Sequence, residues 1–365
     1  MLIILYFIQL IILSIYSWAL IDPNITLVNH PLWSRFLEQM LQLGYYQRQL
    51  SSFIYIEILA GLFVLNYYLV KNNKKFSPIK LALLTGLILI FSYPFLSHDI
   101  FNYLFDAKIL TYYGQNPYLH KALDFPTDPW LRFMHWTHRS YPYGPAFLPL
   151  TLIPSFLAMG KFILNFFFFK IFFTTFYVLT VYYLNKLNRV WAIFYATSPL
   201  VIIEGLVNNH NDIIAVCFAI SGIYYLLKTK RKYLSGLLLL LSAGIKYLTM
   251  PILLLIANPK DKKWDLLAVS GLVGLLIYLS ITSEIQPWYW LNLFILIPYG
   301  YKYLKKINIF FFGLLLSYYP YIAIGDWTNK ENIVVKRNII IIAFIINVCK
   351  LILTNYKTRK LILKK

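Results

Sequence analysis

The chain has 365 residues, of which 59% are hydrophobic, 19% are aromatic and only 13% are charged. This composition, with a mean hydropathy of +0.63, excludes a soluble globular domain and predicts a polytopic membrane protein. The formal net charge of +20 does not indicate nucleic-acid binding, because the basic residues stand as short runs between apolar segments. The two cysteines both fall inside apolar runs, which excludes a disulfide framework and a paired-cysteine metal site.

Apolar segments recur along the chain at the length that a membrane-spanning helix needs, about 20 residues for about 30 Å of hydrocarbon. Full spans are predicted near residues 1–21, 52–70, 78–96, 162–184, 265–283, 288–304, 308–324 and 338–356. Shorter apolar pieces lie at 145–160, 190–207, 212–227, 233–245 and 249–257. The first segment has no basic n-region and no small-residue cleavage site, so a retained anchor is expected there. The predicted fold class is all-α, with residues 1–365 forming one integral membrane domain, a polytopic transmembrane helical bundle of about ten to thirteen membrane segments.

The basic runs predict which loops face the cytoplasm, because Lys and Arg concentrate on that side of a membrane protein. They lie at 71–75, 185–189, 228–232 and 259–263, at Lys302, Lys305 and Lys306, and in the tail 357–365. Alternation between the two sides then places the polar stretch 97–144 outside as the first outer loop. Residues 233–257 are too few for two full crossings and are predicted to form a broken hairpin with Lys246 near its apex. The piece 145–160 is left open between a full span and a re-entrant segment.

The remaining polar clusters all fall on the predicted outer face, which indicates a concave site built from several loops. Asp99, Asn102, Tyr103 and Asp106 have the spacing of one polar stripe on a helix, and such a helix is expected to lie flat at the membrane interface. The alternative is a solvated helix with no chemistry. Asp99 directly follows a predicted span, so it is held at a fixed depth, as a general base requires.

Four other features are candidate substrate contacts, and each has a plainer alternative. Glu204 lies among apolar residues, where a carboxylate is costly unless it is paired or faces a cavity, although it could reach the nearby interface instead. His210, Asn211 and Asp212 offer donors and acceptors for a sugar or a metal ion, or form a merely polar loop. Lys246, with no charged neighbours in the sequence, suits a lipid-linked phosphate or simply snorkels. The "QPWYW" motif, residues 286–290, is a substrate contact or an aromatic belt.

These motifs, in this order, resemble the GT-C class of membrane glycosyltransferases. The likeness is carried by an Asp after an outward span, "FDAKILTYYGQNPY", the turn "YPYGP", "SPLVIIEGLVNNHND", the lysine of the next hairpin and "QPWYW". It covers roughly residues 80–300 and is closest to the polyprenyl- or dolichyl-phosphate-mannose-dependent mannosyltransferases, including the first mannosyltransferase of GPI-anchor assembly. The order of the motifs carries the likeness, since none of them is specific alone.

The resemblance implies a multi-pass enzyme of the cell membrane that moves a hexose, in the closest relatives mannose, from a polyprenyl-phosphate donor to a hydroxyl of a glycan, lipid or protein acceptor on the extracytoplasmic side. It implies a single displacement in which the carboxylate of Asp99 deprotonates the acceptor hydroxyl. Asp106 is the second candidate for a catalytic residue. Residues predicted to bind substrate are His98, Asn102, Arg139, Tyr141, Tyr143, Glu204, His210, Asn211, Asp212, Lys246, Gln286, Trp288 and Tyr289. Cations for the leaving phosphate are Lys246, Arg139, His135 and His138.

Two points of this interpretation stay open at the level of sequence. The related enzymes often carry a second acid one or two residues from the first, whereas this chain has "SHDIF" and no further acid before Asp106. No cofactor is therefore assigned, no metal ligand is named, and Mg²⁺ or Mn²⁺ stays an alternative. A transporter or flippase of a lipid-linked or small polar substrate would also be polytopic, but inverted repeats and midplane charges would then be expected. A non-catalytic assembly factor would not need acids held at span ends.

Overall fold

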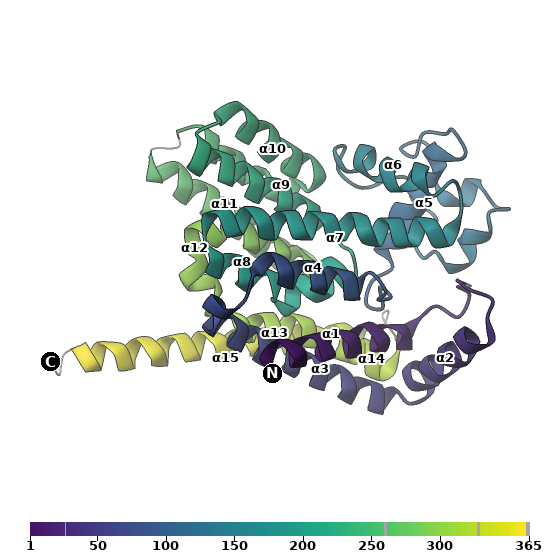
Figure 1. The fold of residues 1–365 in the computed structure, drawn as a ribbon, viewed down its shortest axis with the longest axis horizontal. Coiled ribbons are helices and arrows are strands. Elements are labelled where there is room, and N and C mark those ends of the chain that lie inside the picture. Colours follow the sequence, from purple (N-terminus) through teal and green to yellow (C-terminus); the bar gives the residue numbers. More distant parts are fainter. Residues whose placement is uncertain (26, 259–260, 327–328, 363–365) are drawn as a thin grey trace.

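The structure is a computed structural model that describes residues 1–25, 27–258, 261–326 and 329–362, without the side chains of 355–362. The regular structure in these ranges is entirely helical (Figure 1), which confirms the predicted all-α class. The longer helices are α1 (Leu2–Tyr16), α2 (Pro31–Leu41), α3 (Arg48–Lys71), α4 (Pro78–Leu89), α5 (Asp99–Thr111), α6 (Phe147–Leu157), α7 (Phe162–Leu187), α8 (Arg189–Ala196), α9 (Asp212–Tyr224), α10 (Lys232–Ile245), α11 (Lys262–Thr282), α12 (Ile297–Leu304), α13 (Asn308–Leu316), α14 (Tyr319–Ile324) and α15 (Lys330–Ile362). Tighter or wider turns form η1 (Ser17–Leu20), η2 (Gln42–Tyr46), η3 (Asn73–Lys75), η4 (Ala122–Asp124), η5 (Pro129–Phe133), η6 (Val201–Val207), η7 (Tyr225–Thr229), η8 (Tyr247–Ile256) and η9 (Pro287–Leu296).

Six helices are long and apolar enough to cross a membrane, which confirms a polytopic bundle. They are Leu2–Leu20, Arg48–Lys71, Phe162–Leu187, Asp212–Thr229, Lys262–Thr282 and Lys330–Thr354. Helices α8 and η6, which meet at an angle of 65°, form either a broken seventh span or a re-entrant segment. Shorter apolar helices fill the space between these spans.

Three predicted spans are not continuous helices, and proline accounts for each difference. The expected span 78–96 stops at Leu89, shortly before Pro94, and the chain continues without helix to His98. The expected span 288–304 is divided into η9 and α12 at Pro298, and 308–324 is divided into α13 and α14 ahead of Pro320. Proline lacks the N–H that a helix interior needs and disfavours a helical residue before it, so each segment ends or bends there.

The two uncertain segments next to the outer loop both form short helices. The predicted broken hairpin is confirmed, because α10 ends at Ile245, η8 begins at Tyr247, and a Cβ on Gly236 would lie 3.4 Å from Ile256 of the returning arm. The piece 145–160 forms α6, whose 11 residues reach only about 17 Å. It is therefore too short for a full crossing. The Ala146 N–H donates to the Gly244 carbonyl at 3.0 Å, which joins α6 to the hairpin apex.

Helix α5 forms where the polar stripe predicted it, and the protein covers it on both sides. Every residue from Ile100 to Ile109 is buried, on the apolar side as well as the polar side. Phe101 packs on Phe162 and Phe166 of α7, and residues 112–146 close over the rest. The spacing of polar residues therefore predicted the helix, and its polar side faces protein because the outer loop folds back over it.

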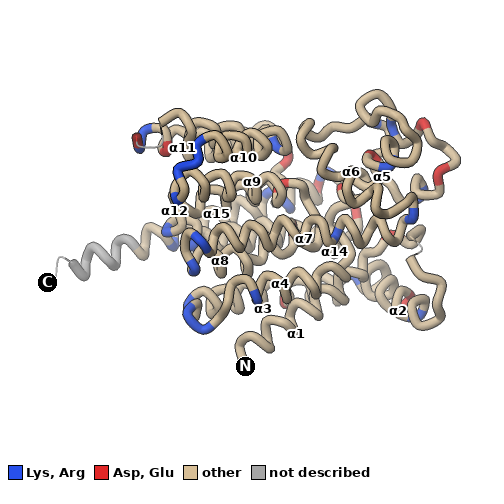
Figure 2. The backbone as a smooth tube through the Cα atoms, turned by 45° about the horizontal axis from the view of Figure 1, so that its top comes forward, with Lys and Arg blue, Asp and Glu red and all other residues tan. Residues whose placement is uncertain are grey.

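Most of the basic runs lie at one end of the bundle, whereas α5 and α6 lie at the other, where Lys and Arg are scattered (Figure 2). The Arg189 guanidinium donates to the carbonyls of Asn73, Lys74 and Phe76, so two of the basic flanks meet directly. The flanks at 259–263 and 357–365 fall partly or wholly outside the residues whose side chains are described. This separation has the form that alternating spans with cytoplasmic basic loops would produce.

Which end faces the cytoplasm can be tested by labelling single cysteines. Leu119 in the outer loop and Tyr233 at the start of α10 are 77% and 95% exposed. In a background with Cys217→Ser and Cys349→Ser, we expect Leu119→Cys to react with an impermeant maleimide from the outside of intact cells, and Tyr233→Cys to react only after permeabilisation. Labelling of both positions from the same side would contradict the predicted topology.

Candidate active site

The loop 208–211, between η6 and α9, is held in place by a lysine in the middle of a span. Lys170 of α7 is 1% exposed, and its ammonium group donates to the carbonyls of Leu206 and Val207 at 2.8 and 3.1 Å. It also donates to Asn209 Oδ1 at 2.9 Å and Ser92 Oγ at 3.0 Å. Helix η6 ends at Val207, so its last carbonyls have no following turn to bond, and the buried cation satisfies them. The sequence signal for this residue was a single lysine directly after a run of four phenylalanines.

His210, in this loop, lies between two carboxylates that come from distant parts of the chain. Its Nδ1 is 3.5 Å from Asp99 Oδ2, at the start of α5, and its Nε2 is 3.3 Å from Glu204 Oε2 in η6. A neutral imidazole has only one N–H, so a ring with a carboxylate near each nitrogen favours the imidazolium. Glu204 is fully buried and also accepts from the Asn208 amide at 3.0 Å. A buried carboxylate without partners would be unfavourable, and the structure gives Glu204 two, His210 and Asn208.

The protonation states of this unit follow from its surroundings. Burial lowers the pKa of His210, but the carboxylates of Asp99 and Glu204 outweigh burial and raise the pKa to about 9. Burial raises the pKa of Asp99, and His210, Lys246 and Arg139 together bring it below its usual value. At neutral pH Asp99 is therefore a carboxylate and His210 an imidazolium.

A second ion pair lies at the N-terminus of α9. Lys246 extends from the break between α10 and η8, and its ammonium group is 2.7 Å from Asp212 Oδ2 and 3.2 Å from Asn211 Oδ1. Asp212 is fully buried and also accepts from the Asn292 amide of η9 at 2.6 Å. Lys246 has no charged neighbour in the sequence, but the fold places it beside Asp212, which lies 34 residues earlier in the chain. Asn292 was not among the predicted residues.

Aromatic residues from the "QPWYW" motif cover both pairs. The Trp288 ring stacks on His210, with centroids 4.2 Å apart and planes 13° apart. The Lys246 ammonium lies 5.6 Å from the centroid of the Tyr289 ring. These contacts bring both aromatic residues to the site, as the sequence predicted.

Only two of the charged groups in these pairs reach the surface. The side chains of Asp99 and Lys246 are 21% and 22% exposed, whereas those of His210, Glu204 and Asp212 are at most 1% exposed. A substrate can therefore meet one carboxylate and one ammonium group, each backed by a buried partner. This arrangement can accept a proton at Asp99 and stabilise an anion at Lys246.

Asp106 has a different environment from Asp99. It is 5% exposed, its Oδ2 has no hydrogen-bond partner, and burial raises its pKa to about 8 despite the opposing effect of Arg139. At neutral pH it is a neutral acid, which does not suit it to accept a proton. Tyr141 and Tyr143 pack edge-on beside each other, and their hydroxyls are buried without partners.

Other predicted residues lie nearby or elsewhere. The Asn102 amide donates to the Trp136 carbonyl at 3.2 Å, and the Arg139 guanidinium lies over the Trp136 ring. Gln286 accepts from Lys336 of α15 at 3.0 Å, in a separate cluster with Glu284. His98 faces His135 rather than the Asp99 unit. The structure therefore does not bring Gln286 and His98 into the paired cluster.

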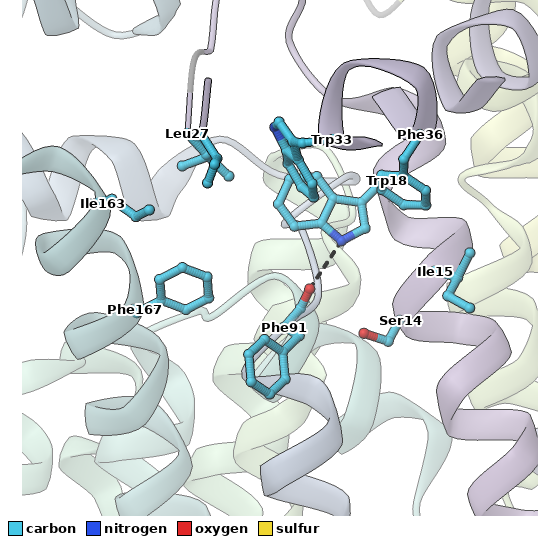
Figure 3. A pocket seen from close by; sticks show the side chains of 10 residues that line it. Ser14, Ile15, Trp18, Leu27, Trp33, Phe36, Phe91, Ile163 and Phe167 are labelled. Atoms are coloured by element: carbon cyan, nitrogen blue, oxygen red, sulfur yellow. Dashed lines mark hydrogen bonds between the residues drawn. The ribbon is translucent and has the colours of Figure 1, made fainter. Parts of the chain in front are cut away.

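An apolar groove of about 240 Å³ lies between the ends of α1, α2, α4 and α7 (Figure 3). Trp18 forms one wall and donates through its indole N–H to the Phe91 carbonyl at 3.0 Å. The groove is lined by Ser14, Ile15, Trp18, Leu27, Val28, Trp33, Phe36, Phe91, Ile163 and Phe167. None of these side chains is ionisable, so the groove can hold hydrocarbon but cannot carry acid–base chemistry.

Comparison with known proteins identifies a family to which the chain is similar. Residues 31–258 match a protein family described as alpha-(1→6)-mannopyranosyltransferase, N-terminal domain. The matched range covers more than half of the chain and contains Asp99, Glu204, His210, Asp212 and Lys246. No curated protein and no solved structure matches the chain.

The paired imidazolium predicts how stability depends on pH. Because folding raises the pKa of His210 from 6.5 to about 9, its contribution to stability is complete below pH 6.5 and is lost as the pH rises through 9. Glu204→Gln removes one carboxylate, so the loss should shift to lower pH. The measurement is the thermal unfolding midpoint between about pH 6 and pH 10, because unfolding shifts with proton binding over that range.

Glu331→Gln, an exposed change at the start of α15, is the matched control and should leave the profile unchanged. Asp106, with its raised pKa, adds a loss of stability with rising pH in every variant, so the comparison rests on the difference between variants. Identical profiles for the parent and Glu204→Gln would contradict the imidazolium.

Proposed function

The chain belongs to the alpha-(1→6)-mannopyranosyltransferase family, and from this premise we propose that it transfers mannose from a polyprenyl-phosphate donor to the hydroxyl of an acceptor. It is a membrane-embedded hexosyltransferase. The observation that carries the finer proposal is the position of Asp99: a partly exposed carboxylate, fixed from behind by His210, with Lys246 and Arg139 close enough to lower its pKa.

In the proposed reaction, Asp99 takes the proton of the acceptor hydroxyl as that oxygen attacks the anomeric carbon of the donor. The bond between the anomeric carbon and the phosphate oxygen breaks, and the polyprenyl phosphate leaves with the electron pair. A single displacement inverts the anomeric centre, so the α-linkage in the family description requires a β-linked donor. The same description points to the 6-hydroxyl of an acceptor sugar as the nucleophile.

His210 and Glu204 explain how Asp99 can take up a proton inside the protein. When Asp99 becomes neutral, His210 would otherwise be a buried cation without a partner, which costs several kcal/mol. Glu204, on the other side of the ring, keeps the imidazolium paired throughout. Both are positioning residues in this scheme, since neither reaches the surface.

Two cations are available for the leaving phosphate. Lys246 is shared with Asp212, so its charge is already partly neutralised. Arg139 has no salt bridge among the described residues, and its Nε is buried without a hydrogen-bond partner. Since both groups lower the pKa of Asp99, both lie near the reacting end of the site. We place the donor phosphate between them, where charge develops as the bond breaks.

The lipid-linked donor and the outer face are supported by the position of the site. Helix α5, which begins at Asp99, lies at the end of the bundle opposite most of the basic runs (Figure 2), which sequence patterning assigns to the cytoplasm. A donor held in the membrane reaches such a site from the lipid, and the sequence carries no glycine-rich nucleotide-binding motif. The proposed location is therefore the extracytoplasmic face of the cell membrane.

The first test replaces the base. Asp99→Asn keeps the shape of the side chain but cannot take a proton, and loss of a general base lowers the rate by about 10²- to 10⁴-fold. The measurement is mannose transfer from a polyprenyl-phosphate donor in matched membranes. Asp106→Asn, which replaces an acid that is already neutral at pH 7, should retain most of the turnover. Near-parental turnover by Asp99→Asn would remove the base from this residue.

The second test concerns the phosphate cations. Lys246→Met alone would leave Asp212 as an unpaired buried charge, so the informative variant is the pair Lys246→Met with Asp212→Asn. This pair and Arg139→Gln should each weaken donor binding by about tenfold or more, the effect of losing one charge-assisted hydrogen bond. Lys161→Met, an exposed cation at the start of α7, should bind donor as the parent does. Unchanged donor affinity in both site variants would refute the placement of the phosphate.

A further inference from the structure

Three side chains that the proposed reaction does not use meet at the edge of the outer loop. They are Asp22, just after η1, His98, the residue before α5, and His135, in the segment after η5. One ligand atom from each lies within 4.8 Å of the others. The three residues are far apart in the sequence, so only the fold brings them together.

The two histidine rings are closer than ordinary packing requires. Their centroids are 3.9 Å apart with planes at 36°, whereas paired aromatic rings usually lie at about 4.5–7 Å. Neither ring makes a hydrogen bond to another of the residues that the structure describes. Asp22 Oδ1 also accepts from the Asn24 N–H at 2.8 Å, and a carboxylate retains further lone pairs beside that bond. Two imidazoles and this carboxylate, gathered within 4.8 Å, are a ligand set for a metal ion.

We propose that Asp22, His98 and His135 bind one divalent transition-metal ion of the zinc type. Ligand atoms of a tetrahedral ion bound at about 2.1 Å lie about 3.4 Å apart, so the three side chains need to close by little more than 1 Å. His135 is exposed and free to make that movement. Imidazole nitrogens favour zinc-type ions over Mg²⁺, which prefers oxygen ligands. Three protein ligands leave one coordination position for water or an anionic oxygen.

The ion would tie together three pieces of the outer end. Asp22 belongs to the segment after the first span, and its backbone N–H donates to the Tyr93 hydroxyl at 3.1 Å. His98 directly precedes Asp99, so a metal bond to His98 would fix the start of α5. His135 would anchor the segment that closes over α5. The site is thus separate from the proposed phosphate cations but adjacent to the proposed base.

The test uses the full chain, purified in detergent without a polyhistidine tag and stripped with a chelator. Cobalt(II) is the probe, because its visible absorption reports a tetrahedral nitrogen and oxygen environment. We expect saturable binding of about one equivalent, displaced by Zn²⁺ and not by equimolar Mg²⁺. His135→Ala and Asp22→Asn should each lower the Co²⁺ affinity at least tenfold, while His138→Ala, an exposed histidine three residues away, should not.

Unfolding midpoints identify any variant that fails to fold, and two independent ligand variants keep the comparison decisive. Absence of saturable Co²⁺ binding in the parent, parental affinity in both ligand variants, or equal displacement by Mg²⁺ would each overturn the assignment. The readout is independent of sugar transfer. A negative result would therefore leave the proposed reaction untouched, and a positive one would not depend on it.

Discussion

A buried positive charge between two carboxylates joins the halves of this site. Asp99 begins α5 in the outer loop, Glu204 lies in the bent segment after α8, and His210 contacts both. Burying the charge of Glu204 would cost free energy without the imidazolium, and burying the imidazolium would cost free energy without a carboxylate beside it. Their mutual dependence fixes the outer loop against the membrane bundle, and it leaves Asp99 partly exposed at a defined place.

The bundle supports this unit with a second buried cation. The chain bends by 65° between α8 and η6, and the last carbonyls of η6, which ends at Val207, lack the N–H groups of a following turn. Lys170 donates to these carbonyls and also to Asn209, whose backbone has a positive φ of 58°. This buried lysine of α7 therefore holds the end of η6 and the loop that carries His210.

Sequence reasoning found the residues whose cost in a membrane is high. Glu204 was identified because a carboxylate among apolar residues needs a partner, and the fold supplies one. Asp99 was identified by its place after a span, His210 by its polar loop, and Lys246 by its isolation at a helix break. It could not find what covers α5, since spacing shows which residues share a face but not what packs against that face. The effect of proline on helix continuity was given too little weight. Three segments were therefore predicted as continuous spans, of which one ends early and two are divided. Partners distant in the sequence, such as Asn292 for Asp212, leave no local signal, and the donor, the acceptor and the side of the membrane stay predictions.

The account depends most directly on the charge of His210, which ¹⁵N NMR of histidine-labelled protein can measure. The His210 signals are assigned by their loss in His210→Gln. Both ring nitrogens should show the imidazolium shift at neutral pH and titrate together near pH 9. A neutral ring at pH 7, with one protonated and one bare nitrogen, would contradict the account, because one carboxylate would then lack its buried partner.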